Sequence, residues 1–193
     1  MNPFSNPCLS VFIGVLFSLQ TIRDYNWHIA AGDNRMNRQT GLDLLRRSTE
    51  DLQRYVSEIP ADRLQWHEAG EWSAHETLGH ICETEREVFL LRAKRLTTEH
   101  NPSLKNFDSE AWHAQHYDPQ RPVAELLADF SEARREMIAA LESQPDWSRA
   151  GFHEGWQKRY SIALLDEYTI HHTWEHLNQI ANTQIAYELA QQF

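Results

Sequence analysis

The fold is decided by residues Ser161–Thr183, which read SIALLDEYTIHHTWEHLNQIANT. Steps of three and four residues through this stretch trace the inward stripe of an amphipathic helix: Ile162, Leu165, Thr169, His172, His176 and Ile180. His172 and His176 occupy stripe positions where a core normally has leucine. Side chains four residues apart lie one above the other on a helix, so these two imidazoles can grip one metal ion. Burying two titratable rings is costly unless something such as a metal compensates.

Three further amphipathic segments precede this helix and predict an all-α fold, a four-helix bundle. They are Thr40–Val56, Ser73–Thr98 and Pro122–Leu141. Ser73 is the predicted N-cap of the second helix, because Glu76 three residues on completes a capping box. Thr40, with the weaker partner Asp43, is the predicted N-cap of the first.

The connections between the predicted helices differ in length. Residues 101–122 form a long one, with a short helix expected at Asp108–Gln115, so a simple up-down-up-down topology is not assured. Residues 146–160 carry glycine and aromatic side chains and are compatible with a short hairpin. No second domain is predicted, so residues 36–193 are expected to form one four-helix-bundle domain.

The first 35 residues stand apart from this pattern. Their apolar run Leu9–Leu19 is too short to span a bilayer, and no Lys or Arg precedes it, as a secretory signal would require. Met36 leads directly into the first predicted helix. We therefore expect residues 1–35 to be a wrongly assigned or unstructured extension, with a signal peptide or a genuine N-terminal helix as the alternatives.

Composition excludes several classes of function. The chain has 193 residues and a net charge of −10 with histidines neutral, and no basic patch is dense enough to follow a phosphate backbone. Nucleic-acid and membrane partners are therefore not expected. The two cysteines, Cys8 and Cys82, make no disulfide framework and suit a reducing compartment, which predicts a cytoplasmic location.

His80 is the best candidate for a third ligand, since catalytic zinc-type sites typically take three from the protein. It lies two turns into the second helix, beside the apolar Leu78 and Ile81. Spacing alone leaves two alternatives open. The histidines could be core residues, each with its own buried hydrogen-bond partner, or a phase slip of one residue could pair His171 with Glu175 instead.

Other polar residues near this constellation have weaker claims. Glu83, three residues after His80, is the candidate catalytic base, with a solvated surface side chain as the alternative. Gln179 is placed to support His176 or to pack the helix end. His113 and His116 form an HxxH pattern in the long connection. Surface exposure is the simpler interpretation, with a second metal site or a role in substrate entry as the alternatives.

Cysteine and tryptophan positions complete the list of candidates. Cys82 falls on the core stripe of the second helix and is interpreted as a small buried hydrophobe rather than a nucleophile. Four tryptophans are candidates for a pocket mouth: Trp66, Trp72, Trp112 and Trp156. For Trp72, a core plug ahead of the helix cap is the favoured interpretation.

Two motifs in this order resemble a known family. WSAHETLGHI at Trp72–Ile81 is similar to the start of the second helix in the DinB/YfiT-like superfamily, and HTWEHLNQI at His172–Ile180 is similar to that family's closing motif. The resemblance extends over roughly residues 40–182. It implies a four-helix bundle with a divalent metal site, often in a homodimer, and places the ligands at His80, His172 and His176.

The resemblance also implies a class of chemistry. Its members include thiol-dependent transferases and isomerases, and many others have no known activity. A dication held by three neutral imidazoles keeps its full charge and can lower the pKa of a water or a thiol. We therefore expect a metal-dependent enzyme of thiol S-transferase or hydrolase type, with zinc or nickel, a small-molecule substrate and possible use of a low-molecular-weight thiol. The alternative is a non-catalytic metal-binding or stress-response bundle.

Overall fold

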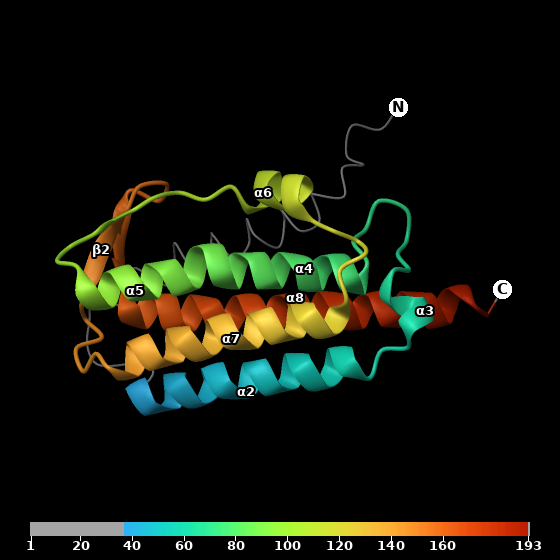
Figure 1. The fold of residues 1–193 in the computed structure, drawn as a ribbon, viewed down its shortest axis with the longest axis horizontal. Coiled ribbons are helices and arrows are strands. Elements are labelled where there is room, and N and C mark those ends of the chain that lie inside the picture. The colour runs from blue at the N-terminus through green and yellow to red at the C-terminus, as the bar shows by residue number, and fades with distance from the viewer. Residues whose placement is uncertain (1–36, 193) are drawn as a thin grey trace.

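Four long helical segments form a bundle in the computed structural model, which describes residues 37–192 (Figure 1). They are α2 (Arg38–Ser57), α4 (Ala74–Thr84) with its continuation α5 (Leu90–Thr98), α7 (Val123–Glu142) and α8 (Ile162–Ala190). A π-helical turn, η1 (Glu85–Phe89), joins α4 to α5. The predicted all-α four-helix bundle is confirmed.

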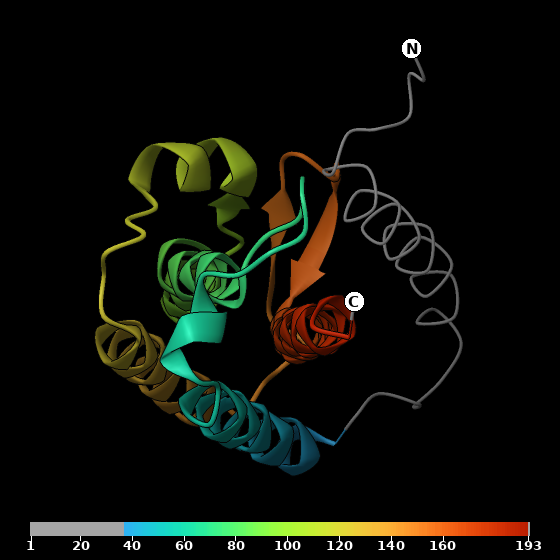
Figure 2. The ribbon, with the colours of Figure 1, turned by 90° about the vertical axis from the view of Figure 1, so that its right-hand side faces the viewer.

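The helices do not follow a simple up-down order. In Figure 1, α2 and α8 run one way, whereas α4–α5 and α7 run the other. The long connection after α5 returns along the whole bundle before α7 begins. The end-on view in Figure 2 places α2 and α4, which are consecutive, across the bundle from each other, and each packs against α7 and α8. This arrangement makes α4 and α8 direct neighbours.

The shorter elements lie outside the four long helical segments. They are α3 (Ala61–Leu64), β1 (Ser103–Leu104), α6 (Ser109–His116), β2 (Ala150–His153) and β3 (Lys158–Ser161). The expected hairpin is β2–β3, in which Gly151 pairs with Tyr160, and β1 adds to it in parallel with Leu104 opposite His153. The expected short helix is α6, whose N-cap Asp108 accepts from the Ala111 backbone N–H.

A polar layer divides the bundle core into two apolar clusters. One cluster contains Leu45 and Met137, and the other contains Leu52 and Phe130. Between them lies Arg134, which is 1% exposed and makes two hydrogen bonds, of 2.7 and 2.8 Å, to the equally buried carboxylate of its ion-pair partner on η1, Glu85.

This buried ion pair reaches all four sides of the bundle. The Arg134 guanidinium also donates to the Leu45 carbonyl and Ser48 hydroxyl of α2, and to the Thr173 hydroxyl of α8 at 2.8 Å. Its three nitrogens are therefore all hydrogen-bonded. The sequence pattern alone did not predict that Arg134 and Glu85 meet.

The predicted start of the first helix is wrong, whereas that of the second is confirmed. The N-cap of α2 is Asn37, whose side chain accepts from the Gln39 backbone N–H at 2.8 Å, so Thr40 lies inside the helix. Asp43 accordingly accepts hydrogen bonds from neighbouring side chains instead of capping. The N-cap Ser73 is confirmed, since its hydroxyl accepts from the Glu76 backbone N–H.

The last helix extends beyond the predicted end at Thr183. It continues to Ala190, although Ile185 and Leu189 are exposed. Contacts with the segment after α2 hold these extra turns: Trp66 meets Tyr187 edge-on at 5.3 Å, and the Arg63 guanidinium lies over the same ring. Such contacts are tertiary, so the apolar rhythm of the helix does not reveal them.

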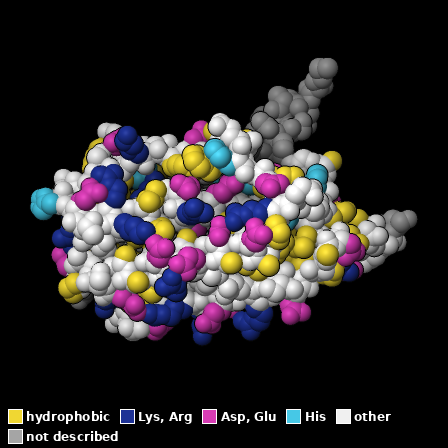
Figure 3. All heavy atoms as spheres, in the orientation of Figure 1, with side chains coloured by type: hydrophobic (Ala, Val, Ile, Leu, Met, Phe, Trp, Pro, Cys, Tyr) yellow, Lys and Arg dark blue, Asp and Glu magenta, His cyan; other side chains and the backbone are white. Residues whose placement is uncertain are grey.

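The prediction for residues 1–35, including Leu9–Leu19, lies outside the described residues. Within the described part, none of the helices has the length and apolarity to cross a membrane. Acidic and basic side chains are interspersed on the face shown in Figure 3. Ion pairs such as Lys94–Glu136 and Arg121–Asp129 link neighbouring elements of the fold.

Candidate metal centre

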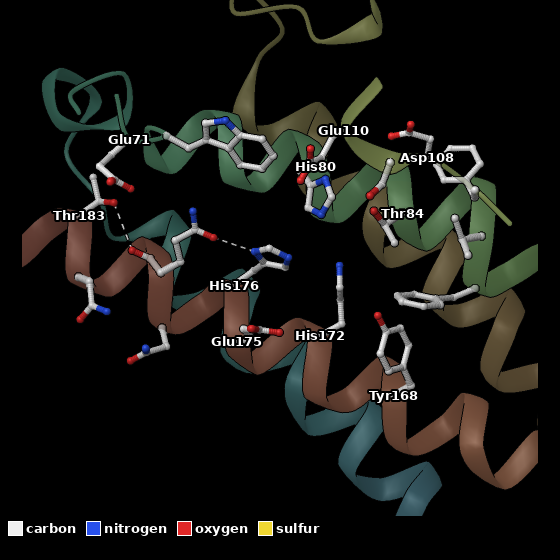
Figure 4. A pocket seen from close by; sticks show the side chains of 18 of the residues that line it. Glu71, His80, Thr84, Asp108, Glu110, Tyr168, His172, Glu175, His176 and Thr183 are labelled. Atoms are coloured by element: carbon white, nitrogen blue, oxygen red, sulfur yellow. Dashed lines mark hydrogen bonds between the residues drawn. The ribbon is translucent and has the colours of Figure 1, made fainter. Parts of the chain in front are cut away.

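Three histidines from two neighbouring helices converge on one point. His80 comes from α4, and His172 and His176 come from adjacent turns of α8 (Figure 4). One ring nitrogen of each lies within 4.8 Å of the others. The ring centroids are 4.4–5.5 Å apart. The structure therefore brings together all three residues that the sequence predicted as ligands.

Burial keeps these imidazoles neutral. The His80 and His176 side chains are buried, and His172 is half-buried. Burial lowers the pKa of His80 and His172 well below the ordinary value, and repulsion from neighbouring histidines lowers it further. Burial also lowers the pKa of His176, although the hydrogen bond to Gln179 partly opposes it. Neutral imidazole is the form that binds metals.

The hydrogen bonds around the cluster fit a metal ion. His176 Nδ1 lies 2.8 Å from Gln179 Oε1, which can only accept, so the imidazole donates from Nδ1 and keeps the lone pair on Nε2. Orientation of a ligand by such a bond is usual at metal sites. His80 Nδ1 is buried without a hydrogen-bond partner, which is uncommon for a buried polar atom. Support of His176 by Gln179, one of its two predicted roles, is confirmed.

The alternative phase of α8 is wrong. His171 is exposed, and its Nδ1 lies 3.6 Å from Glu175 Oε2 in a surface contact. Neither residue belongs to the group of potential ligands found among residues 37–192. The interpretation as separately satisfied core histidines also fails for His80, whose Nδ1 has no partner.

A cavity of about 810 Å³ opens beside the histidines, between α4, α8 and shorter elements that include α6 and the β2–β3 hairpin. Trp66, Trp72 and Trp156 line it as predicted, whereas Trp112 does not. The core-plug interpretation of Trp72 is wrong, because its ring is half-buried and lies 5.3 Å from that of His80. The hairpin adds His153, which the sequence did not single out.

His113 lies behind this wall and was not expected to be buried. Its ring is 4.8 Å from that of Trp72, and its Nδ1 is 2.8 Å from Glu83 Oε2. Burial lowers the pKa of His113, but Glu76 and Glu83 raise it more strongly, to about 9, so the ring is cationic at neutral pH. The pair of carboxylates thus holds α6 onto α4 through one imidazolium.

The structure also shows where three further candidate residues lie. Glu83, the predicted base, directs its carboxylate to His113 and is not among the residues that line the cavity. His116 is exposed and stacks on Trp112 at 3.9 Å. Neither His113 nor His116 belongs to the group of potential metal ligands or lines the cavity among the described residues. Cys82 is buried as predicted: its Sγ donates to the Leu126 carbonyl, and burial raises the pKa of the thiol.

Fold and site together define a class: a four-helix-bundle protein whose two adjacent helices carry a three-histidine cluster able to hold a divalent ion. The chain belongs to the DinB superfamily, whose family model matches residues 44–180. This confirms the resemblance seen in the two sequence motifs. Among curated proteins, none matches the chain.

Two solved structures share the fold. YfiT from Bacillus subtilis, described as a probable metal-dependent hydrolase with an unusual four-helix bundle topology, is 18% identical with a TM-score of 0.67; the match covers 81% of this chain and 93% of YfiT. TT2238, described as a four-helix bundle protein, is 16% identical with a TM-score of 0.53, over 76% of this chain and 99% of TT2238. At these identities the likeness concerns the fold.

Proposed function

We propose that the protein binds one divalent metal ion through His80, His172 and His176 and uses it in a hydrolytic reaction on a small molecule. One observation carries this proposal: three neutral imidazoles converge beside a cavity, and the buried Nδ1 of His80 has no partner within the protein. Three protein ligands leave a coordination position for a reactant, as in catalytic rather than structural sites.

The donor set determines which ions are expected. Imidazole nitrogen suits zinc, nickel, iron and copper, and zinc or nickel is the expected occupant. Bound there, the ion would supply Lewis acidity. Residues of the chain orient the ligands and line the space beside them. Gln179 fixes the ring of His176. The Thr84 hydroxyl lies one helical turn from His80, and the Tyr168 hydroxyl lies one turn from His172, both on the cavity wall.

Hydrolysis is favoured over thiol transfer by the surroundings of the cluster. Low-molecular-weight thiols of cells are largely anionic, and the one arginine among the described cavity residues, Arg92, is already engaged with the Lys105 carbonyl and the Tyr160 ring. The name given to YfiT agrees with hydrolysis. The homodimer and the cytoplasmic location stay predictions; light scattering of the purified protein checks the former.

Metal analysis tests the ligand assignment. Protein that is stripped with a chelator and then reloaded should hold about one divalent ion per chain, and the double change His172→Ala with His176→Ala should abolish retention. His171→Ala is the matched control, because this exposed histidine is next to a ligand in sequence but turned away from it. Equal metal content in the double variant and the control would reject the site.

Activity measurements then test the reaction. Metal-loaded protein should hydrolyse members of a panel of esters and amides, and the double variant should not. Addition of glutathione-type thiols should leave the rate unchanged. A rate that depends on the thiol would assign the protein to thiol transfer instead, and no rate above the metal-free blank would favour the non-catalytic alternative.

A further inference from the structure

The cavity beside the histidines is lined by acidic side chains. Five carboxylates belong to its wall: Glu68, Glu71, Asp108, Glu110 and Glu175. Figure 4 shows Glu71 and Asp108 at opposite ends with the histidines between them. Glu68, Glu71 and Glu110 are exposed and form no ion pair with a described residue, so their charges face whatever enters the cavity.

Positive charge on this wall is scarce. Among the described lining residues only Arg92 is a permanent cation, and its buried guanidinium is held by the Lys105 carbonyl and the Tyr160 ring. Burial, and then Arg92, lowers the pKa of His153 to about 4, so this histidine is neutral. The cationic His113 lies behind Trp72 and is balanced by two carboxylates. Carboxylates outnumber cations here even after a dication binds.

Aromatic rings make up much of the remaining wall. They are Trp66, Trp72, Phe89, Phe107, Trp156 and Tyr168. The faces of such rings attract organic cations, most strongly where water is excluded. Aromatic walls also bury the apolar body of a small molecule. A wall of this kind next to carboxylates selects for positive charge on an apolar frame.

One hydroxyl on the cavity wall is an independent sign of ligand binding. The Thr84 side chain is buried, and its Oγ1 has no hydrogen-bond partner. Figure 4 shows it on the cavity wall, one helical turn after His80. A buried hydroxyl without a partner is costly, and an uncharged polar group of a ligand would satisfy it.

We propose that the substrate of this site is an organic cation, whose positively charged end lies against the carboxylates and aromatic rings and whose uncharged polar group reaches Thr84 and the histidines. This inference rests on the proposed function, since it names the substrate class of the same site. It excludes anionic metabolites and anionic thiols as the principal ligands.

Binding to chelator-treated protein tests the proposal separately from the metal. Three probes share a phenyl ring and differ in charge: benzyltrimethylammonium, benzyl alcohol and benzenesulfonate. At low salt, calorimetric titration should show the ammonium probe binding about tenfold more tightly than the sulfonate, and the difference should shrink as salt screens the carboxylates. Quenching of tryptophan fluorescence should accompany binding, since three tryptophans line the cavity.

A pair of matched double variants locates the effect. Glu71→Gln with Glu110→Gln should weaken binding of the ammonium probe about threefold. Glu50→Gln with Glu58→Gln, which removes the same charge from exposed positions on and just after α2, should leave it unchanged. Equal binding of all three probes, a preference for the sulfonate, or equal effects of both variants would overturn the proposal. None of these outcomes depends on whether the protein retains metal.

Discussion

Two buried polar clusters touch the same stretch of α8, and they differ in how completely they are satisfied. Around Arg134, every guanidinium nitrogen has an acceptor within the protein, including the Thr173 hydroxyl. His172, which directly precedes Thr173 in α8, belongs to the histidine cluster, where His80 Nδ1 and the nearby Thr84 hydroxyl have no hydrogen-bond partner. Burial of polar groups costs desolvation free energy in both clusters. Only the cluster around Arg134 offsets this cost fully with hydrogen bonds inside the protein.

This difference in hydrogen bonding indicates that one cluster stabilises the fold and that the other binds a ligand. A closed network that reaches α2, η1, α7 and α8 fixes how the helices sit against one another, and a ligand could add nothing to it. An open cluster beside a cavity has unused lone pairs and is completed only from outside. Of these two clusters, we expect the completely hydrogen-bonded one to hold the helices together and the incomplete one, which lines a cavity, to bind a ligand.

The closed cluster should fail most severely when one member is removed. Arg134→Met leaves the Glu85 carboxylate buried and unpaired, which should lower the free energy of unfolding by about 3–5 kcal/mol, measured by urea denaturation. The double change Arg134→Met with Glu85→Met should restore most of this loss, because an apolar pair needs no partner. A cost below about 1 kcal/mol for the single change would show that the network is not a packing device.

Asp166 offers an intermediate case, a buried carboxylate whose Oδ1 has no partner and which lies outside the cavity. It packs against Gly41 of α2, where an added Cβ would lie only 2.2 Å from the carboxylate. Burial, and then Glu167, raises the pKa of Asp166 to about 7, although Arg134 opposes the shift. Here the cost of burial is met by protonation rather than by a ligand.

The raised pKa of Asp166 gives a defined dependence of stability on pH. The folded state holds the proton more tightly than the unfolded state, so this contribution is complete below about pH 4 and is lost as pH rises through about 7. Asp166→Asn should therefore raise the free energy of unfolding at pH 8 by on the order of 1–3 kcal/mol and change it little at pH 4. Urea denaturation at both values checks this, with the exposed Asp62→Asn as control. If the free energy of unfolding changed between pH 4 and pH 8 by the same amount in Asp166→Asn as in the wild type, the prediction would be contradicted.

Two threonines give the smallest and most direct test of the comparison. Thr173→Val removes an acceptor of the buried Arg134 guanidinium and should cost about 1–2 kcal/mol. Thr84→Val removes a hydroxyl with no partner, so it should leave stability unchanged or raise it by up to about 1 kcal/mol. Thermal unfolding of both variants in metal-free protein measures the contrast. Equal losses would mean that the two clusters do not differ as described.

The sequence predicted the features that depend on helix phase. A stripe with steps of three and four residues placed His172 and His176 on one face. The position of His80 beside Leu78 and Ile81 made it the best candidate for the third ligand, without showing that the three meet. The N-cap at Ser73 depends on local sequence and was predicted correctly. The sequence did not predict that Arg134 meets Glu85, because this depends on which helices are neighbours and on the π turn at Glu85.

The sequence also did not predict which residues of the long connections lie near the site, because this too depends on which elements are neighbours in the fold. His113 and His153 reach the site region on α6 and on the hairpin, and no periodicity links them to His80. The role of Glu83 depends on His113 in turn, since the imidazolium occupies its carboxylate. Patterns within one helix thus gave the potential ligands, whereas the wall around them came from topology.

The π turn at Glu85–Phe89 has a consequence for how this protein can vary. A π turn amounts to an α-helix with one extra residue, so it offsets the angular position of α5 from that of α4. The residue spacing that places His80 on its face of α4 therefore does not continue in phase into α5, although both segments pack against α7. Deleting one residue within the turn would return it to regular α-helix and leave the later side chains of α5 on their present faces, whereas deleting one residue elsewhere in α4 or α5 would turn every later side chain by about 100°.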